Sequence, residues 1–260
     1  MNEAKISAFI VCWNEERNIR RCLESVKWCD EIVIVDSGST DATLQICKEY
    51  TDQITHRPWS GYVEQKRFAL SLCSHDWALN IDADEEVSPE LMTEIRSTLN
   101  SAQSSQVNGY ALSRVVYYLG KWWRKGGWYP EYRLRLCRKN RTTWGGTDPH
   151  EKAIVEGATA KLSGELRHYT YTGVADQISR LNRYSTTIAE NLYRSGERSS
   201  AIKIFLNPVS RFFKFYILKK GFREGLPGLI VACIEAYYAF LKYVKLWELE
   251  RSKNKSNHSA

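Results

Sequence analysis

The chain has 260 residues, of which 43% are hydrophobic and 26% charged, and this balance excludes a disordered protein and allows one large α/β domain with an appendage. The net charge of +7 resides at one end, because residues 200–260 hold 11 Lys and Arg against 4 Glu. A neutral body with a cationic, aromatic tail argues against a nucleic-acid groove and favours an anionic lipid surface.

Cysteine usage and the N-terminus bear on the compartment. Seven cysteines without a CxxC pair favour buried thiols in a reducing environment. Residues 1–16 lack the layout of a signal peptide, because the apolar run is short and acid follows it. We therefore expect a cytoplasmic protein.

Strands and helices alternate through the first hundred residues. Short apolar runs predict strands at 6–12, 31–35 and 77–81. Apolar residues that recur every three or four positions predict a helix after each of these strands, and a further helix is expected at 62–72. Ser88-Pro89-Glu90 is a strong helix start. This alternation predicts a Rossmann-like, mainly parallel sheet with helices on both faces.

Polar residues follow the predicted strands. Asn14, a candidate helix cap, comes after the first strand, Asp36 ends the second, and Asp82 follows the third. Because ligands bind beyond the carboxyl ends of parallel strands, we expect the three to converge on one crevice. The sequence has neither GxGxxG nor GxxxxGK[ST], so a dinucleotide fold and a P-loop are not indicated.

Asp82 and Asp84 are the central candidates for chemistry. In an extended chain, residues two apart point to the same face, so their carboxylates would lie together. Such a pair suits Mg²⁺ or Mn²⁺ shared with substrate phosphates. The alternative is a solvated acidic turn before a helix.

The next segment, 101–175, is rich in aromatic and reactive side chains. We expect strands at 110–118 and 133–137 and an edge strand at 166–171. Residues 120–130 are aromatic, basic and punctuated by glycine, and 144–151 reads as a loop without helix or strand.

The last part is predicted to be helical. From Asp176 onward, residues at spacings of three and four predict one face of a helix. Beyond Gly196 the chain combines apolar, aromatic and basic residues. Residues 226–247 are long enough to cross a membrane, but Pro227, Glu235 and Lys242 favour helices that lie in the interface.

Several motifs in order resemble a known family. Asn14-Glu15-Glu16, the segment 35–41 (VDSGSTD) and Asp82-Ala83-Asp84 are together similar to the inverting glycosyltransferase family 2, which has the GT-A fold. Later stretches resemble the lipopolysaccharide core β-1,4-glucosyltransferases of the WaaE type; these are 126–130, His150-Glu151, 181–184 and 214–217.

The resemblance implies a domain plan. Residues 1–175 would form the GT-A catalytic domain, with a nucleotide-sugar half at about 1–100 and an acceptor half at about 101–175. Residues 176–250 would form a helical, amphipathic membrane-associating region and 251–260 a disordered tail. The protein would lie peripherally on the inner face of the inner membrane.

Donor-site roles also follow from the resemblance. It implies that Asp36 and the turn of Asn14, Glu15 and Glu16 hold the nucleotide, although Ser37 stands where many members have a second acid. Arg67, with Lys66 beside it, would approach the diphosphate. Asp82 would contact the ribose or the metal, Asp84 would bind Mg²⁺ or Mn²⁺ directly, and His150 is a candidate third ligand. Surface charge is the alternative for Arg67 and Lys66, and a structural hydrogen bond for His150.

The expected reaction moves a hexose from a UDP-sugar, by resemblance UDP-glucose, to an inner-core heptose of lipid-linked lipopolysaccharide. Glu151 is the candidate general base and Asp148 the runner-up. Candidate acceptor contacts are Trp122, Trp128, Tyr129 and Arg133. Their alternatives are core packing for the aromatic residues and solvated charge for the arginine.

Three rival interpretations remain. One is another family 2 transferase of envelope glycans with a different donor or acceptor. A nucleotidyltransferase also uses paired acids, but it would show a glycine- and basic-rich loop near its first strand. A nucleic-acid binder would carry its charge over the folded body.

Overall fold

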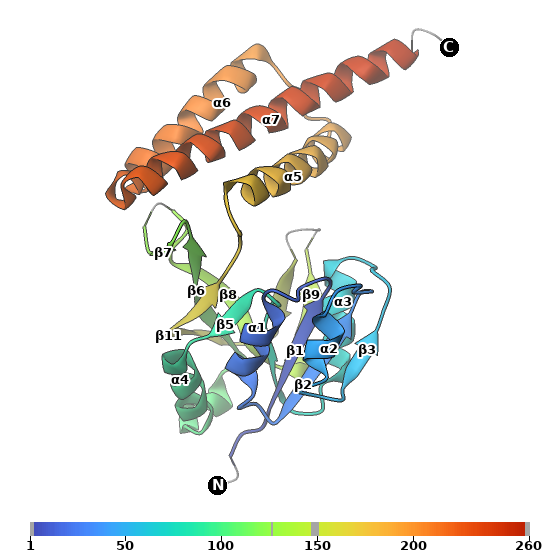
Figure 1. Ribbon diagram of the computed structural model, residues 1–260, viewed down its shortest axis with the longest axis vertical. Helices are drawn as coiled ribbons and strands as arrows, with labels where there is room; N and C mark the ends of the chain where they lie inside the picture. The colour runs from blue at the N-terminus through green and yellow to red at the C-terminus, as the bar shows by residue number, and fades with distance from the viewer. Residues whose placement is uncertain (1–2, 126, 147–150, 258–260) are drawn as a thin grey trace. The chain divides into compact units, whose positions relative to one another are not determined.

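The structure, a computed structural model, describes residues 3–125, 127–146 and 151–257. The chain divides into two compact units (Figure 1). The first comprises residues 1–116 and 130–169, and the second residues 117–129 and 170–260. The segment 117–129, which the sequence analysis assigns to the acceptor half, thus belongs to the second unit.

A mixed sheet organises the first unit. Within the described residues its strand order is β3-β2-β1-β4-β8-β6-β11-β5. These strands are β1 (Ile6–Cys12), β2 (Glu31–Asp36), β3 (Ile54–His56), β4 (Trp77–Asn80), β5 (Glu85–Val87), β6 (Gly109–Tyr118), β8 (Glu131–Arg138) and β11 (Thr159–His168). The first four are parallel, but β8 is antiparallel to β4 and β6, and β5 is antiparallel to β11.

Strand β11 is again parallel to β6, so the sheet is mixed, and the prediction of a mainly parallel sheet is confirmed for β1 to β4 but not for the sheet as a whole. The strand expected at 166–171 as an edge is instead β11, which starts earlier and lies between β6 and β5. Short strands β9 (Thr142–Gly145) and β10 (Lys152–Val155) form a separate hairpin, so the segment expected to be loop at 144–151 begins in a strand.

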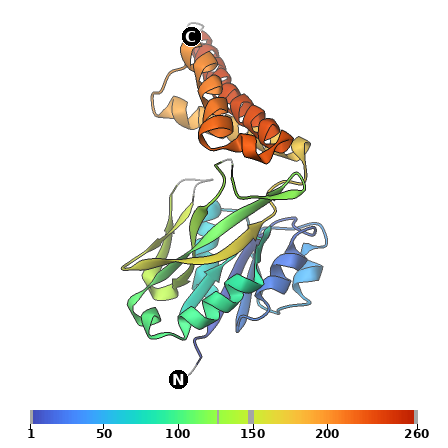
Figure 2. The same cartoon turned by 90° about the vertical axis from the view of Figure 1, so that its left-hand side faces the viewer.

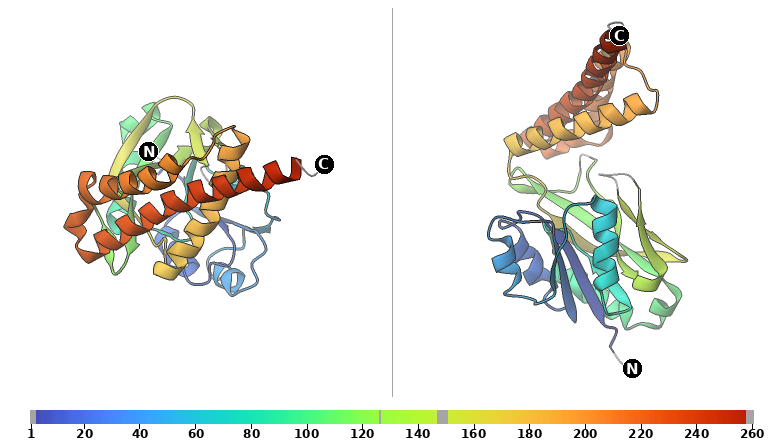
Figure 3. Two further views of the ribbon diagram at one scale, coloured as in Figure 1. Left: turned by 90° about the horizontal axis from the view of Figure 1, so that it is seen from above. Right: turned by 90° about the vertical axis from the view of Figure 1, so that its right-hand side faces the viewer.

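Helices cover both faces of the sheet because β1 is apolar on both sides. Its residues Ala8, Ile10 and Cys12 face one core cluster, and Phe9 belongs to the other. The first cluster includes α1 (Ile19–Val26), α2 (Thr43–Cys47) and α4 (Pro89–Leu99), and the second includes α3 (Tyr62–Leu72) and the β9–β10 hairpin. Figure 2 shows α4 in front of the sheet, and the right view of Figure 3 shows α3 in front of it.

Local signals explain several helix ends. The predicted start of α4 is confirmed, because the Ser88 hydroxyl accepts a hydrogen bond from the Leu91 N–H and Pro89 is the first helical residue. The expectation that Asn14 caps a helix is wrong: α1 begins after Asn18, and Asn14 has a φ of 54° in a turn.

The second unit is mainly helical (Figure 3, left). It contains β7 (Lys121–Trp123), α5 (Val174–Arg194), α6 (Ala201–Phe213), the short π-helix η3 (Lys214–Leu218), the short 3₁₀-helix η4 (Gly221–Glu224) and α7 (Leu226–Asn257). Helix α7 packs on α5 and α6. It continues to Asn257, so the segment predicted to be a disordered tail is helical to that residue. None of the helices in the described part of the chain is both long and apolar enough to cross a bilayer.

Candidate active site

The loops after β1 and β2 are locked together. The Asn14 Oδ1 accepts a hydrogen bond from the Thr40 N–H at 2.8 Å, and the Asn14 N–H donates to Ser39 Oγ at 2.9 Å. Asp36 is buried, and its carboxylate accepts the N–H groups of Gly38 and Ser39. Two of the three residues expected to converge, Asn14 and Asp36, therefore meet through their loops at the carboxyl ends of β1 and β2. The third, Asp82, follows β4, which is the neighbour of β1 on its other side.

Glu15 and Glu16 also belong to this pair of loops. The Glu15 N–H donates to Thr43 Oγ1 at 2.8 Å, and a carboxylate oxygen of Glu16 accepts the Ala42 N–H at 3.2 Å. Much of the hydrogen-bonding capacity of this turn thus orders the loop itself.

Asp82 lies between two cations. Lys66 Nζ donates to Asp82 Oδ1 at 2.8 Å, and the Arg135 guanidinium pairs with Oδ2. Arg135 also donates to Asn80 Oδ1 at 2.6 Å and to Glu85 Oε1 at 2.7 Å. Burial raises the pKa of the Asp82 carboxyl, but the charges of Arg135 and Lys66 outweigh it and hold that pKa well below its usual range.

Asp84 has a different partner. Its Oδ2 lies 3.2 Å from Nε2 of His168, at the end of β11. Burial raises the pKa of Asp84, but the charge and hydrogen bond of His168 prevail and lower it. The antiparallel pairing of β5 with β11 places His168 opposite Glu85 and so brings the histidine to this site.

The expected geometry of the two aspartates needs correction. Strand β4 ends at Asn80, and the Glu85 N–H donates to the Asp82 carbonyl at 2.8 Å. The two carboxylates therefore lie in a tight turn rather than on an extended strand, and each contacts its own partners.

Helix α3 contributes Lys66 rather than Arg67. Lys66 is 4% exposed, and its Nζ also donates to Glu151 Oε1 at 3.0 Å. Arg67 turns away, with Nε donating to the Trp144 carbonyl at 2.9 Å and Nη1 pairing with Glu64. Glu151 thus lies with Asp82 around one ammonium group. The candidates Asp148 and His150 fall outside the described residues.

The proposed acceptor contacts are divided between the two units. Trp122 packs on Tyr117 and Trp128 on Trp123, and these residues and Tyr129 belong to the second unit. Arg133, in the first unit, donates to Glu131 at 2.9 Å. Trp122 and Trp128 thus pack against other aromatic side chains, and Arg133 forms an ion pair.

The donor set suits a divalent cation that a substrate helps to hold. Asp84 and His168 offer one oxygen and one nitrogen, whereas Asp82 is engaged by Lys66 and Arg135. No group of three or more His, Cys, Asp or Glu side chains suited to a metal occurs among the described residues. Mg²⁺ is bound in such sites through one or two carboxylates, water and substrate phosphates. The Asp84 carboxylate fits that pattern, whereas the imidazole of His168 is not a usual Mg²⁺ ligand.

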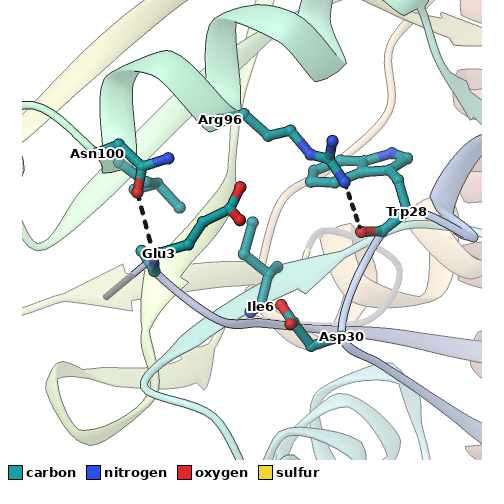
Figure 4. A pocket seen from close by; sticks show the side chains of 8 residues that line it. Glu3, Ile6, Trp28, Asp30, Arg96 and Asn100 are labelled. Atoms are coloured by element: carbon teal, nitrogen blue, oxygen red, sulfur yellow. Dashed lines mark hydrogen bonds between the residues drawn. The ribbon is translucent and has the colours of Figure 1, made fainter. Parts of the chain in front are cut away.

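A separate pocket at the amino end of β1 has a structural explanation (Figure 4). Arg96 Nη2 donates to the Trp28 carbonyl at 3.1 Å, and its guanidinium lies over the Trp28 ring. The Ala4 N–H donates to Asn100 Oδ1 at 3.1 Å. These contacts tie the N-terminal segment and the loop after α1 to α4, at the opposite end of β1 from Asn14.

Sequence comparison decides the family. The model of "Glycosyl transferase family 2" matches residues 7–154. The chain belongs to glycosyltransferase family 2. It is 35% identical to the lipopolysaccharide core biosynthesis glycosyltransferase LpsC of Rhizobium meliloti (strain 1021), over 97% of this chain and 95% of that protein. An uncharacterized glycosyltransferase of Rickettsia typhi is 33% identical over 96% of this chain and 89% of its own length.

Solved structures show weaker likeness. Glucosyl-3-phosphoglycerate synthase from Mycobacterium tuberculosis, crystallised with phosphoglyceric acid, is 16% identical with a TM-score of 0.48, covering 76% of this chain and 82% of that one. TarS residues 1–349 of S. aureus are 15% identical with a TM-score of 0.45, covering 97% and 92%.

Family membership confirms the predicted enzyme class. The protein is a family 2 glycosyltransferase, and its mixed, curled sheet with helices is a GT-A-like fold. The nucleotidyltransferase and nucleic-acid binder considered from the sequence are thereby set aside.

Three residues of the site escaped the sequence analysis in whole or in part. The sequence predicts a role for Lys66 only as the neighbour of Arg67, and it predicts no site role for Arg135 or His168. Arg135 lies in the strand predicted at 133–137, where it is 6% exposed and pairs with Asp82 and Glu85. Two features of the sequence could have indicated a buried ion pair here. Arg135 alternates with apolar residues on a predicted strand, and the acidic residues Glu85 and Glu86 have no other assigned role.

Proposed function

We propose that this enzyme transfers a hexose, glucose from UDP-glucose in a β-1,4 linkage, to the inner-core heptose of lipopolysaccharide. The relative LpsC supports the pathway, because it is described as a core biosynthesis glycosyltransferase and aligns over nearly the whole chain. Donor, linkage and acceptor sugar come from the resemblance of the motifs to the WaaE type.

The meeting of Asp82, Lys66 and Glu151 is the observation that carries the site. Lys66 Nζ lies 2.8 Å from Asp82 Oδ1 and 3.0 Å from Glu151 Oε1. A carboxylate on the loop after β9 is thus close to the turn that follows β4. This proximity supports a donor site and an acceptor base that act on one anomeric carbon.

Glu151 serves as the general base in this proposal. Its carboxylate takes the proton of the acceptor hydroxyl as the hydroxyl oxygen attacks the anomeric carbon. The bond from that carbon to the diphosphate oxygen breaks on the opposite face, and both bonding electrons leave with UDP. Attack opposite the leaving group inverts an α-linked donor to a β-linked product.

Two groups of residues would hold the donor. Asp84 and His168 would bind Mg²⁺ or Mn²⁺, with the donor diphosphate supplying further oxygens. When bound, the cation supplies positive charge that stabilises the departing diphosphate. Lys66, already poised between two carboxylates, would add a second positive charge to the leaving group.

The nucleoside would lie over the interlocked loops. Asn14 and Asp36 shape these loops through hydrogen bonds to backbone N–H groups. Their fixed geometry supports binding of the base and ribose with little loop reordering. We propose that the enzyme acts on the inner face of the inner membrane, where lipid-linked acceptors are assembled.

A donor screen tests the proposal. Enzyme stripped with EDTA is supplied with one UDP-sugar at a time, a heptose-containing core acceptor and either Mg²⁺ or Mn²⁺, and UDP release is followed. We expect acceptor-dependent release with UDP-glucose only after a metal is restored. Release with a different sugar would favour another envelope-glycan transferase, and full activity in EDTA would contradict the metal site.

A further inference from the structure

Helix α6 presents its apolar residues to solvent. Phe205 is 68% exposed and Leu206 61%, on a helix of which no described residue is buried. Exposed large apolar side chains recur at spacings of three and four along the helix and the turn that follows it: Ile202, Phe205, Leu206, Val209, Phe213, Ile217 and Leu218. We call these seven residues the α6 stripe.

The polar residues of the same helix face the other way. Arg211 lies against α7, where Nη2 pairs at 2.8 Å with Glu235, a residue that is 8% exposed. Lys203 Nζ donates to the Arg198 carbonyl at 2.7 Å and pairs with Glu197. Ile204, Pro208 and Phe212 are half-buried, so α6 has apolar residues toward the protein and toward solvent, whereas the exposed face of a helix on a soluble domain is usually polar. The α6 stripe is therefore an interaction surface.

The charge around the stripe identifies its partner. Residues 201–223 contain six Lys and Arg and neither Asp nor Glu. Lys214, Lys219, Lys220 and Arg223 are exposed at the end of the stripe. Exposed Phe222 and Leu226 extend the apolar surface among these cations.

We propose that the α6 stripe inserts into the surface of an anionic lipid bilayer, with α6 lying in the plane of the membrane. An amphipathic helix with aromatic and aliphatic residues on one side and cations at its edge binds in this way. A second copy of the chain would bring cations against cations, so self-association fits this surface poorly. The inference rests on the proposed function in one respect, because a lipid-linked acceptor requires the enzyme at a membrane.

Vesicle flotation tests the proposal with the full-length protein. Vesicles of phosphatidylcholine alone are compared with vesicles of equal parts phosphatidylglycerol and phosphatidylcholine, at low and high salt. We expect the protein to float with the anionic vesicles at low salt and to be released as salt rises. The double substitution F205E and L206E should weaken this binding by roughly tenfold or more, because it replaces inserted apolar groups with anions.

Leu72→Glu is the matched control. Leu72 is a comparably apolar exposed residue on α3, 37% exposed, and lies outside the α6 stripe. Its substitution should leave flotation unchanged. Equal flotation of the wild type and of the F205E and L206E variant would overturn the proposal. It would also be overturned if the wild type bound no lipid but formed a dimer that the double substitution dissociates.

A second readout separates this inference from the proposed function. UDP release with a water-soluble core oligosaccharide should be unchanged in the F205E and L206E variant, while transfer to acceptor embedded in vesicles falls. Loss of vesicle binding with retained soluble activity supports the stripe. A wild type that binds vesicles but transfers no sugar would refute the proposed function and leave the membrane surface intact.

Discussion

The ammonium of Lys66 lies 3.0 Å from the carboxylate of Glu151, although 85 positions separate the two residues in the sequence. The same ammonium lies 2.8 Å from Asp82. A single buried cation thus joins the turn after β4 to the loop that carries the candidate base. An incoming diphosphate would compete for this ammonium and leave Glu151 available to the acceptor.

Substitution of Lys66 should cost far more activity than substitution of its neighbour. We expect Lys66→Ala to lower kcat/KM for acceptor-dependent UDP release by about 100-fold, because a cation aimed at developing charge is lost. Arg67→Ala removes the same charge from an exposed side chain of the same helix, so its effect should stay within about threefold. Equal effects of the two substitutions would contradict the assignment.

His168 should govern metal affinity. We expect His168→Ala to raise the Mn²⁺ concentration at half-saturation by at least about tenfold, measured by electron paramagnetic resonance of free Mn²⁺ in the presence of UDP. His75 lies before β4, away from the Asp84 turn, and His75→Ala is the control. Unchanged Mn²⁺ binding in His168→Ala would remove this histidine from the site.

Gly164 is required by the close approach of β11 to α4. A Cβ at this position would lie 2.5 Å from the Leu91 Cα, a backbone atom that cannot move aside cheaply. Gly164→Ala should therefore lower the free energy of unfolding by about 1–3 kcal/mol. Gly173→Ala, where nothing lies within 4 Å, should change it by less than about 0.5 kcal/mol in the same urea titration. A stable Gly164→Ala protein would show that the two elements separate readily.

Glu31 should make part of the stability dependent on pH. Burial raises the pKa of its carboxyl, but hydrogen bonds donated by Ser7 and Ser74 prevail and lower it. A lowered folded-state pKa contributes stability above the unfolded pKa of about 4.3, and this contribution is lost as pH falls through the folded pKa.

The corresponding measurement is urea denaturation of Glu31→Gln against wild type. At pH 7 the substitution should lower the free energy of unfolding by about 1 kcal/mol, and the difference should shrink toward pH 3. Glu156→Gln, an exposed substitution, is the control. A difference that grows at low pH would contradict the proposed role of the serines.

The elements that sequence analysis predicts well are those whose signal is local. Strand β1 is an apolar run of the right length, and α3 has the predicted bounds of 62–72. Strand β5 was missed because Glu85 and Glu86 look like a solvated turn. Glu85 is fully buried only because Arg135 and Arg114, which are distant in sequence, pair with it.

The site shows the same limit. The sequence predicts roles for Asp82, Asp84 and Glu151, and the structure brings Asp82 and Glu151 to one ammonium group, but the sequence favours Arg67 over Lys66. Which of two adjacent basic residues faces inward depends on the rotation of α3, which packing against the sheet determines. His168 reaches Asp84 through the pairing of β11 with β5, and no local pattern reports such a pairing.

The most direct test of the account is the activity of Glu151→Gln, measured together with its affinity for the donor. Glutamine keeps the size of the side chain and a carbonyl oxygen for Lys66 but cannot take up a proton at neutral pH. We predict that kcat for transfer falls by about 100-fold or more, while the dissociation constant for UDP-glucose, measured by calorimetry, changes little. Turnover within a few-fold of wild type would contradict the role of Glu151 as the base.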